Sequence, residues 1–241
     1  MMQTPGLMPL ALSAGFGGIF VVALWLLPAE LAGQRQVGRG ATSIYLQALG
    51  SVPEFAAVRS WRVQQAQLTG CDDLLAGPSA KIADPQAMHR VAGACLKRAD
   101  EVLRSSPTAA IAHLVRAQAL AFLGRSVDAE SALLLAQKTA PHEGWLAARR
   151  LRFVLLNNGL DVPLTGGTAP ASEIDLALRA DVLTVLQIDD YLPLLVQLYQ
   201  RQTDRRAWLL AAVEKAPIAR KRAFLALLRG ALRGASNGGR G

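Results

Sequence analysis

Three histidines, two cysteines and the adjacent aspartates Asp189 and Asp190 are considered first as residues that could support chemistry at a site. His89, His113 and His142 form no recognisable metal-binding spacing with another histidine, cysteine or carboxylate. Asp189 and Asp190 could hold a cation, but an isolated pair is more typical of a helix N-cap and a solvated charge. The sequence therefore predicts no metal and no cofactor.

Nucleophilic and phosphate-binding motifs are also missing from the sequence. There is no Gly-x-Ser-x-Gly elbow, no Cys-His pairing of known spacing and no Gly-x-Gly-x-x-Gly after a strand. Gly166 and Gly167 lie in a loop without the Lys-Ser/Thr pair of a phosphate loop. We therefore expect a protein that is not an enzyme.

Cys71 and Cys95 are the only cysteines. Their even number and separation suit a disulfide that ties a loop to the following helix, which would place the folded part in an oxidising compartment. Two ordinary buried thiols are the alternative.

Positive charge is concentrated at the C-terminus. From Val213 to Gly241 there are seven basic residues against Glu214 alone, so this stretch carries +6 of the net charge of +8. A helix after Pro217 would place leucines on one side and basic residues on the other. Such a helix either caps the last repeat or binds anionic lipid or an acidic polymer. Because no aromatic residues interleave with the basic ones, nucleic acid is not an expected partner. The candidate contact residues are Arg220, Lys221, Arg222, Arg229 and Arg233.

Alanine and leucine dominate the elements that must position these residues, and no two strand-like segments flank a tight turn, so the predicted fold is all-α. Leu7 to Ala29 contains no charged residue, and about 20 apolar residues suffice to cross a bilayer. We expect an uncleaved transmembrane anchor, with a cleaved signal as the alternative. Arg35 and Arg39 favour a cytoplasmic C-terminal side, whereas the cysteines favour a periplasmic one.

A helical hairpin is predicted between Pro107 and Pro141, an interval of 34 residues. Ala117 and Ala129 are small residues at the points where the two helices would cross, and Gly124 lies at the turn. This pattern resembles the tetratricopeptide repeat family, which has the same period. His113 and Arg116 depart from it, because the family usually has a large aromatic residue and a leucine there.

Neighbouring repeats are degenerate. One period upstream, Cys95 occupies the small position, but Asp84-Pro85 interrupts the equivalent first helix; downstream, the pattern stops at Asn157-Asn158-Gly159. Since one hairpin cannot bury its own apolar face, the flanking helices must stack on it. An ordinary all-helical domain with one accidental interval is the alternative.

The run from Ala140 to Leu151 resembles short tetratricopeptide-like periplasmic proteins of bacterial exopolysaccharide loci, in which a Pro-x-Glu-Gly-Trp turn leads into an Arg-Arg-Leu helix. This resemblance implies a bacterial inner-membrane protein with a periplasmic soluble domain.

We expect a membrane-anchored scaffold that binds a protein partner, within a membrane complex, in a groove lined by first-helix residues. The predicted groove residues are His113, Arg116, Gln118, Arg149 and Arg150. The predicted segments are an anchor or uncleaved signal at 1–33, a linker at 34–40, the repeat domain at 41–203, C-terminal helices at 204–234 and a flexible tail at 235–241.

Overall fold

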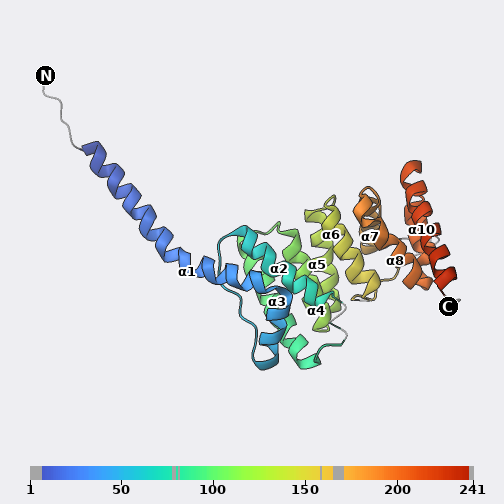
Figure 1. The fold of residues 1–241 in the computed structure, drawn as a ribbon, viewed down its shortest axis with the longest axis horizontal. Helices are drawn as coiled ribbons and strands as arrows, with labels where there is room; N and C mark the ends of the chain where they lie inside the picture. The colour runs from blue at the N-terminus through green and yellow to red at the C-terminus, as the bar shows by residue number, and fades with distance from the viewer. Residues whose placement is uncertain (1–6, 78–79, 81, 158, 165–170, 239–241) are drawn as a thin grey trace, which may run out of the picture.

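The computed structural model describes residues 7–77, 80, 82–157, 159–164 and 171–238, and every regular element in these ranges is helical. A long helix, α1 (Leu7–Gly50), projects from one end of a body in which α2 to α10 follow one another along the long axis (Figure 1). The last helix, α10, lies at the opposite end of the body (Figure 1). The prediction of an all-α fold is confirmed for the described residues.

The N-terminal helix continues where the sequence predicted a linker. The backbone of 34–39 is helical, and the break falls at Gly40, whose φ of 60° and ψ of −161° are non-helical. The segment predicted as a linker is therefore helical except at its last residue. Side chains of residues 1–21 lie outside the described part, which includes most of the predicted anchor. Among the residues with described side chains, no helix is both long and apolar enough to cross a bilayer.

Two residues dock α1 onto the body. The Glu30 carboxylate accepts hydrogen bonds from the backbone N–H groups of Arg59 (2.7 Å) and Ser60 (3.1 Å), at the start of the next helix. Gly33 lies so close to Val58 that an added Cβ would stand 2.4 Å from its methyl group. A helix N-terminus has unsatisfied N–H groups and a positive dipole end, so a carboxylate there stabilises the junction.

A disulfide joins the first two helices of the body. Cys71 in α2 (Trp61–Leu75) is bonded to Cys95 in α3 (Pro85–Ser105), and neither sulfur-bearing residue is exposed. Asp84 and Pro85 begin α3 instead of interrupting a helix: the Asp84 carboxylate accepts from the Ala87 N–H at 2.7 Å, and Pro85 occupies the first turn.

The predicted hairpin is present as α4 (Ala110–Phe122) and α5 (Ser126–Thr139), which pack against each other. Ala117 and Ala129 are fully buried, as close packing of two helices requires. Gly124 has a φ of 78° in the turn, a conformation that favours glycine. This arrangement is compatible with a helical repeat.

Beyond the hairpin, α6 (Gly144–Leu151) runs directly into a π-helical turn, η2 (Arg152–Leu156). The later helices cover the remaining length of the body. They are α7 (Glu173–Leu186), η3 (Asp189–Tyr191), α8 (Leu192–Arg201), η4 (Thr203–Arg205), α9 (Arg206–Val213) and α10 (Ile218–Gly238).

The C-terminal helix packs against α8, and it buries Phe224 fully and Leu228 to 5% exposure. One apolar core extends from Ile44 to Leu228. Helix α10 reaches Gly238 and so includes the first residues of the predicted tail at 235–241; residues 239–241 lie outside the described part.

Candidate functional site

The predicted groove residues of α4 do not share one surface. His113 is buried and its Nε2 lies 2.8 Å from the Pro107 carbonyl oxygen. Gln118 is 1% exposed and donates from Nε2 to the Asp72 carboxylate at 2.6 Å. Both side chains therefore belong to the packing between helices, and neither is exposed on the outer surface of α4.

Arg116 lies on the surface between α3 and α4. Its guanidinium is paired with the Asp100 carboxylate at 2.9 Å, and both side chains are partly exposed. Arg116 is therefore available at the surface, but it is not among the residues that surround Arg149.

Arg150 is a buried structural residue. Its guanidinium forms two hydrogen bonds with the Asp181 carboxylate, at 2.7 and 2.8 Å, and donates to the carbonyl oxygens of Ala136 (3.1 Å) and Ala140 (3.2 Å). With no exposed surface, it cannot contact a partner. Successive helix residues are rotated by about 100°, so Arg150 points inward where Arg149 points outward, and Arg150 lies in the core and not on a surface groove.

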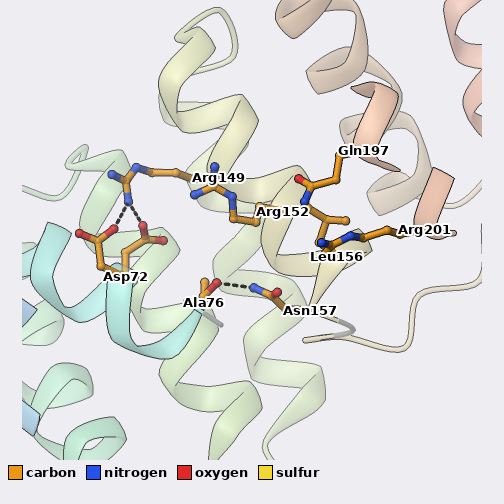
Figure 2. A pocket seen from close by; sticks show the side chains of 10 residues that line it. Asp72, Ala76, Arg149, Arg152, Leu156, Asn157, Gln197 and Arg201 are labelled. Atoms are coloured by element: carbon orange, nitrogen blue, oxygen red, sulfur yellow. Dashed lines mark hydrogen bonds and ion pairs between the residues drawn. The ribbon is translucent and has the colours of Figure 1, made fainter. Parts of the chain in front are cut away.

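Arg149 lies in a cleft of about 610 Å³ on one side of the body, which we call the basic cleft. Helices α2, α6, η2 and α8 supply its walls (Figure 2). The lining residues are Asp72, Asp73, Ala76, Gly77, Arg149, Arg152, Leu156, Asn157, Gln197 and Arg201.

In the left part of the basic cleft, as drawn in Figure 2, the charge of Arg149 is already matched by carboxylates. The Arg149 guanidinium pairs with the carboxylates of Asp72 and, at 3.1 Å, of Asp73. It also lies 5.8 Å from the centre of the Trp145 ring, within the range of a cation–π contact. Arg149 therefore joins α6 to α2 within the protein.

The other part carries positive charge without paired carboxylates. Arg152 and Arg201 are exposed, and neither forms an ion pair with a described carboxylate. Figure 2 shows Arg152, Gln197 and Arg201 reaching into the same space from η2 and α8, while Arg149 turns toward Asp72. Guanidinium and amide N–H groups in this arrangement can donate to an oxyanion.

The π-helical turn sets the position of Arg152. Its carbonyl oxygen accepts from the Asn157 N–H at 3.1 Å, and the Asn157 side chain donates to the Ala76 carbonyl of α2. The Val154 carbonyl oxygen accepts from Arg205 Nη1 at 3.2 Å. Hydrogen bonds to Arg205 and to the Ala76 carbonyl oxygen thus hold the turn to neighbouring segments. Turns of π-helix are frequent at functional sites.

Burial and like charge are both evident in the electrostatics of the cleft. Burial lowers the pKa of Arg149, and the nearby positive charge of Arg152 lowers it further. Burial also raises the pKa of Asp73 above its ordinary value of 3.8, although Arg152 partly opposes this. An anion bound near Arg152 would relieve the repulsion between the two arginines.

Sequence reasoning missed Arg152, Asn157, Gln197 and Arg201. Arg152 stands three residues after Arg149, a spacing that puts both on one helix face, so this signal was present. No local pattern predicted that the end of α8 would bring Arg201 to the same place.

The C-terminal basic residues divide into two groups. Arg220 donates to the Leu186 carbonyl oxygen (2.6 Å) and to the Asp189 carboxylate (2.8 Å), and Lys221 pairs with Glu214 at 2.7 Å, so both hold α10 to the body. The side chains of Arg222, Arg229 and Arg233 are exposed.

No group of three or more histidine, cysteine or acidic side chains among the described residues could hold a metal ion. No protein-family model matches the sequence, and no curated protein or solved structure shows significant similarity to it.

Proposed function

We propose that this protein is a helical-repeat scaffold that binds an acidic segment of a partner protein in the basic cleft. The observation that carries the proposal is the convergence of Arg152 and Arg201, from two separate helices, on one cleft where no described carboxylate pairs with them. Two guanidinium groups facing one space repel each other unless an anion lies between them.

The chemistry of the cleft favours carboxylate groups as ligands. Arginine presents a planar fork of N–H donors that matches a carboxylate in a bidentate arrangement. A cleft of about 610 Å³ that is open to solvent can receive several residues of an extended segment, not only one small ion. Stacked helical hairpins commonly present extended binding surfaces of this kind.

We further propose that α1 anchors the scaffold in a membrane. Leu7 to Ala29 is free of charged residues, and the projecting helix exposes large apolar side chains such as Trp25, which is 77% exposed, and Val22, which is 55% exposed. The Cys71–Cys95 disulfide favours an oxidising compartment, so we place the body in the bacterial periplasm. The resemblance of the Ala140–Leu151 run suggests a membrane complex for assembly or export of a cell-surface polysaccharide.

Photo-crosslinking in the native cell tests the partner. A photoreactive amino acid at Leu156, which lines the basic cleft, should form an adduct with an acidic segment of another protein, identified by mass spectrometry. The same group at Leu135, which is exposed on α5, is the position control.

Charge reversal then tests the arginines. Arg152→Glu with Arg201→Glu should abolish the Leu156 adduct. The matched double variant Arg62→Glu with Arg104→Glu reverses two exposed arginines outside the basic cleft and should preserve it. An adduct that survives reversal of Arg152 and Arg201, or one formed only with lipid, contradicts the proposal.

A second candidate function is binding of anionic lipid or an acidic polymer by α10. Ile218, Leu225 and Leu232 recur every seven residues and are 63%, 37% and 48% exposed, and exposed Arg222 and Arg229 follow the same repeat beside them. An apolar stripe beside a basic stripe suits an anionic membrane surface.

Vesicle sedimentation tests whether α10 binds anionic lipid or only covers the end of the helical body. Arg222→Glu with Arg229→Glu should reduce binding to phosphatidylglycerol vesicles, and added salt should weaken binding of the unaltered chain. Equal vesicle binding of the unaltered chain and the double variant at low salt would show that α10 only covers the end of the body.

A further inference from the structure

A second, smaller cavity adjoins the basic cleft where the end of α2 meets α4 and η2. It has a volume of about 240 Å³ and shares Gly77 and Asn157 with the basic cleft. We call it the Gln118 pocket. Its lining includes Leu75, Gln118, Phe122, Phe153, Asn157 and Gly159.

Gln118 supplies this pocket with a buried acceptor that has no partner. Its Nε2 donates to Asp72 Oδ1 at 2.6 Å, while its Oε1 is buried and lacks a hydrogen-bond partner among the described residues. Because Asp72 is a carboxylate that also pairs with Arg149, the Gln118 amide must turn its N–H group toward Asp72. The carbonyl oxygen is therefore fixed on the other side of the amide.

Such an acceptor is unusual in a folded protein. Most buried polar side-chain atoms have a hydrogen-bond partner, and an unpaired one is costly. Gln118 is also only 1% exposed, so bulk water does not reach the amide freely. An unpaired acceptor in a residue that lines a cavity points to a ligand that carries a hydrogen-bond donor.

Apart from Gln118 and Asn157, the residues that line the pocket are apolar or aromatic. Phe153 is 3% exposed and packs so closely on Gly159 that an added Cβ would lie 2.1 Å from its ring. Phe122 is 38% exposed, which leaves part of its ring accessible from solvent. Aromatic rings pack favourably against such walls, and tryptophan and tyrosine add a polar hydrogen to an aromatic body.

We infer that the Gln118 pocket binds an aromatic ring bearing an N–H or O–H donor, which donates to Gln118 Oε1. A volume of about 240 Å³ lies below the about 300–1,000 Å³ of pockets for drug-sized ligands, so one side chain fits better than a whole cofactor. The next step rests on the proposed function: together, the two adjoining cavities recognise an acidic segment that contains a tryptophan or tyrosine.

Matched small probes test the pocket without the partner. Indole and 1-methylindole differ by the donor, as do p-cresol and 4-methylanisole, and the two pairs distinguish a tryptophan-like from a tyrosine-like ligand. With the full-length chain, dissociation constants from NMR titration should be about fivefold lower for the donor-bearing probe, the effect of one net hydrogen bond. Equal affinities within both pairs, as expected if a water molecule already satisfies Oε1, would overturn the inference.

Two variants locate the effect. Gln118→Leu should abolish the preference for the donor-bearing probe. Ala121→Leu should fill the pocket and weaken all four probes while leaving the Gln118–Asp72 hydrogen bond in place, so it remains informative if Gln118→Leu fails to fold. Binding that is unchanged in Ala121→Leu would place the probes elsewhere and refute the inference.

The cleft variants separate this inference from the proposed function. Arg152→Glu with Arg201→Glu should leave indole binding unchanged, although it abolishes the crosslink to the acidic partner. Loss of probe discrimination in the unaltered chain refutes the pocket alone, and a persistent crosslink refutes the cleft alone.

Discussion

Arg150 and Asp181 form an ion pair that is almost completely buried, with 1% of each side chain exposed and two hydrogen bonds of 2.7 and 2.8 Å between guanidinium and carboxylate. The pair joins α6 to α7, and the Ala136 and Ala140 carbonyl oxygens at the end of α5 satisfy further guanidinium N–H groups. One arginine thus connects the hairpin to the second half of the body.

We expect removal of one member of this pair to be strongly destabilising. Asp181→Ala leaves a buried guanidinium without its counter-ion and should lower the free energy of unfolding by about 3–5 kcal/mol. The double variant Arg150→Met with Asp181→Leu should recover most of that loss, because no buried charge remains. Guanidinium chloride denaturation measures the free energy of unfolding of the single and the double variant.

The exposed pair Arg125–Asp128 serves as the control, since its side chains are 55% and 51% exposed. Asp128→Ala should cost less than about 1 kcal/mol. Equal effects of Asp128→Ala and Asp181→Ala would show that burial does not decide the strength of these pairs.

The disulfide is expected to contribute substantially to stability. Cys71 and Cys95 are 24 residues apart, and closing a loop of this length removes enough unfolded-state entropy to be worth about 3 kcal/mol. Cys71→Ala with Cys95→Ala should lose that amount in chemical denaturation. A reductant present throughout should destabilise the unaltered chain and leave the double variant unchanged; no effect on either form would argue against a stabilising cross-link.

The sequence was sufficient for the elements whose limits are set locally. The α4–α5 hairpin follows from its small residues Ala117 and Ala129 and from Gly124 at the turn. These signals act over one or two helical turns and do not depend on the rest of the fold.

The candidate site could not be predicted in the same way. Its walls come from α2, η2 and α8, and only tertiary packing brings Arg201 near Arg152. Adjacent Arg149 and Arg150 were assigned to one groove, because the sequence does not show which of two neighbouring arginines turns toward Asp181. The linker at 34–40 was inferred from composition, but its backbone continues α1.

Binding of anions in the basic cleft should strengthen on acidification. Burial raises the pKa of Asp73, so this carboxylate is protonated at a higher pH than an ordinary aspartate, and its loss of charge frees part of the Arg149 guanidinium. Sulfate, which remains ionised, should bind up to about fivefold more tightly at a pH below the raised pKa of Asp73 than at pH 7.

Asp73→Asn should show the tighter sulfate binding at both pH values. The raised pKa also fixes the sign for stability: the folded state binds this proton more readily than the unfolded state, so Asp73 favours folding at low pH. That contribution is lost as the pH rises through the raised pKa. Denaturation across the same range should therefore show the unaltered chain gaining stability relative to Asp73→Asn on acidification; the opposite trend would contradict the assignment.

The junction between α1 and the body should depend on Glu30. Glu30→Ala removes the acceptor for the Arg59 and Ser60 N–H groups and should cost about 1 kcal/mol. The segment between α1 and α2 should become more sensitive to limited proteolysis. Asp190→Ala removes an exposed carboxylate of η3, which is not part of this segment, and provides the comparison; equal cleavage in both variants would mean that Glu30 does not hold the segment.

Arg220 should hold α10 against the body. Its guanidinium donates to the Leu186 carbonyl oxygen at the end of α7 and to the Asp189 carboxylate of η3. Arg220→Ala removes both hydrogen bonds of a charged donor and should lower the free energy of unfolding by about 1.5–3 kcal/mol. Arg229→Ala, on the exposed side of the same helix, should change it by less than about 0.5 kcal/mol. Urea denaturation gives the free energy of unfolding of both variants. Equal losses would show that apolar contacts alone hold α10 to the body. In that case the larger loss should come from Phe224→Ala, which removes a fully buried side chain.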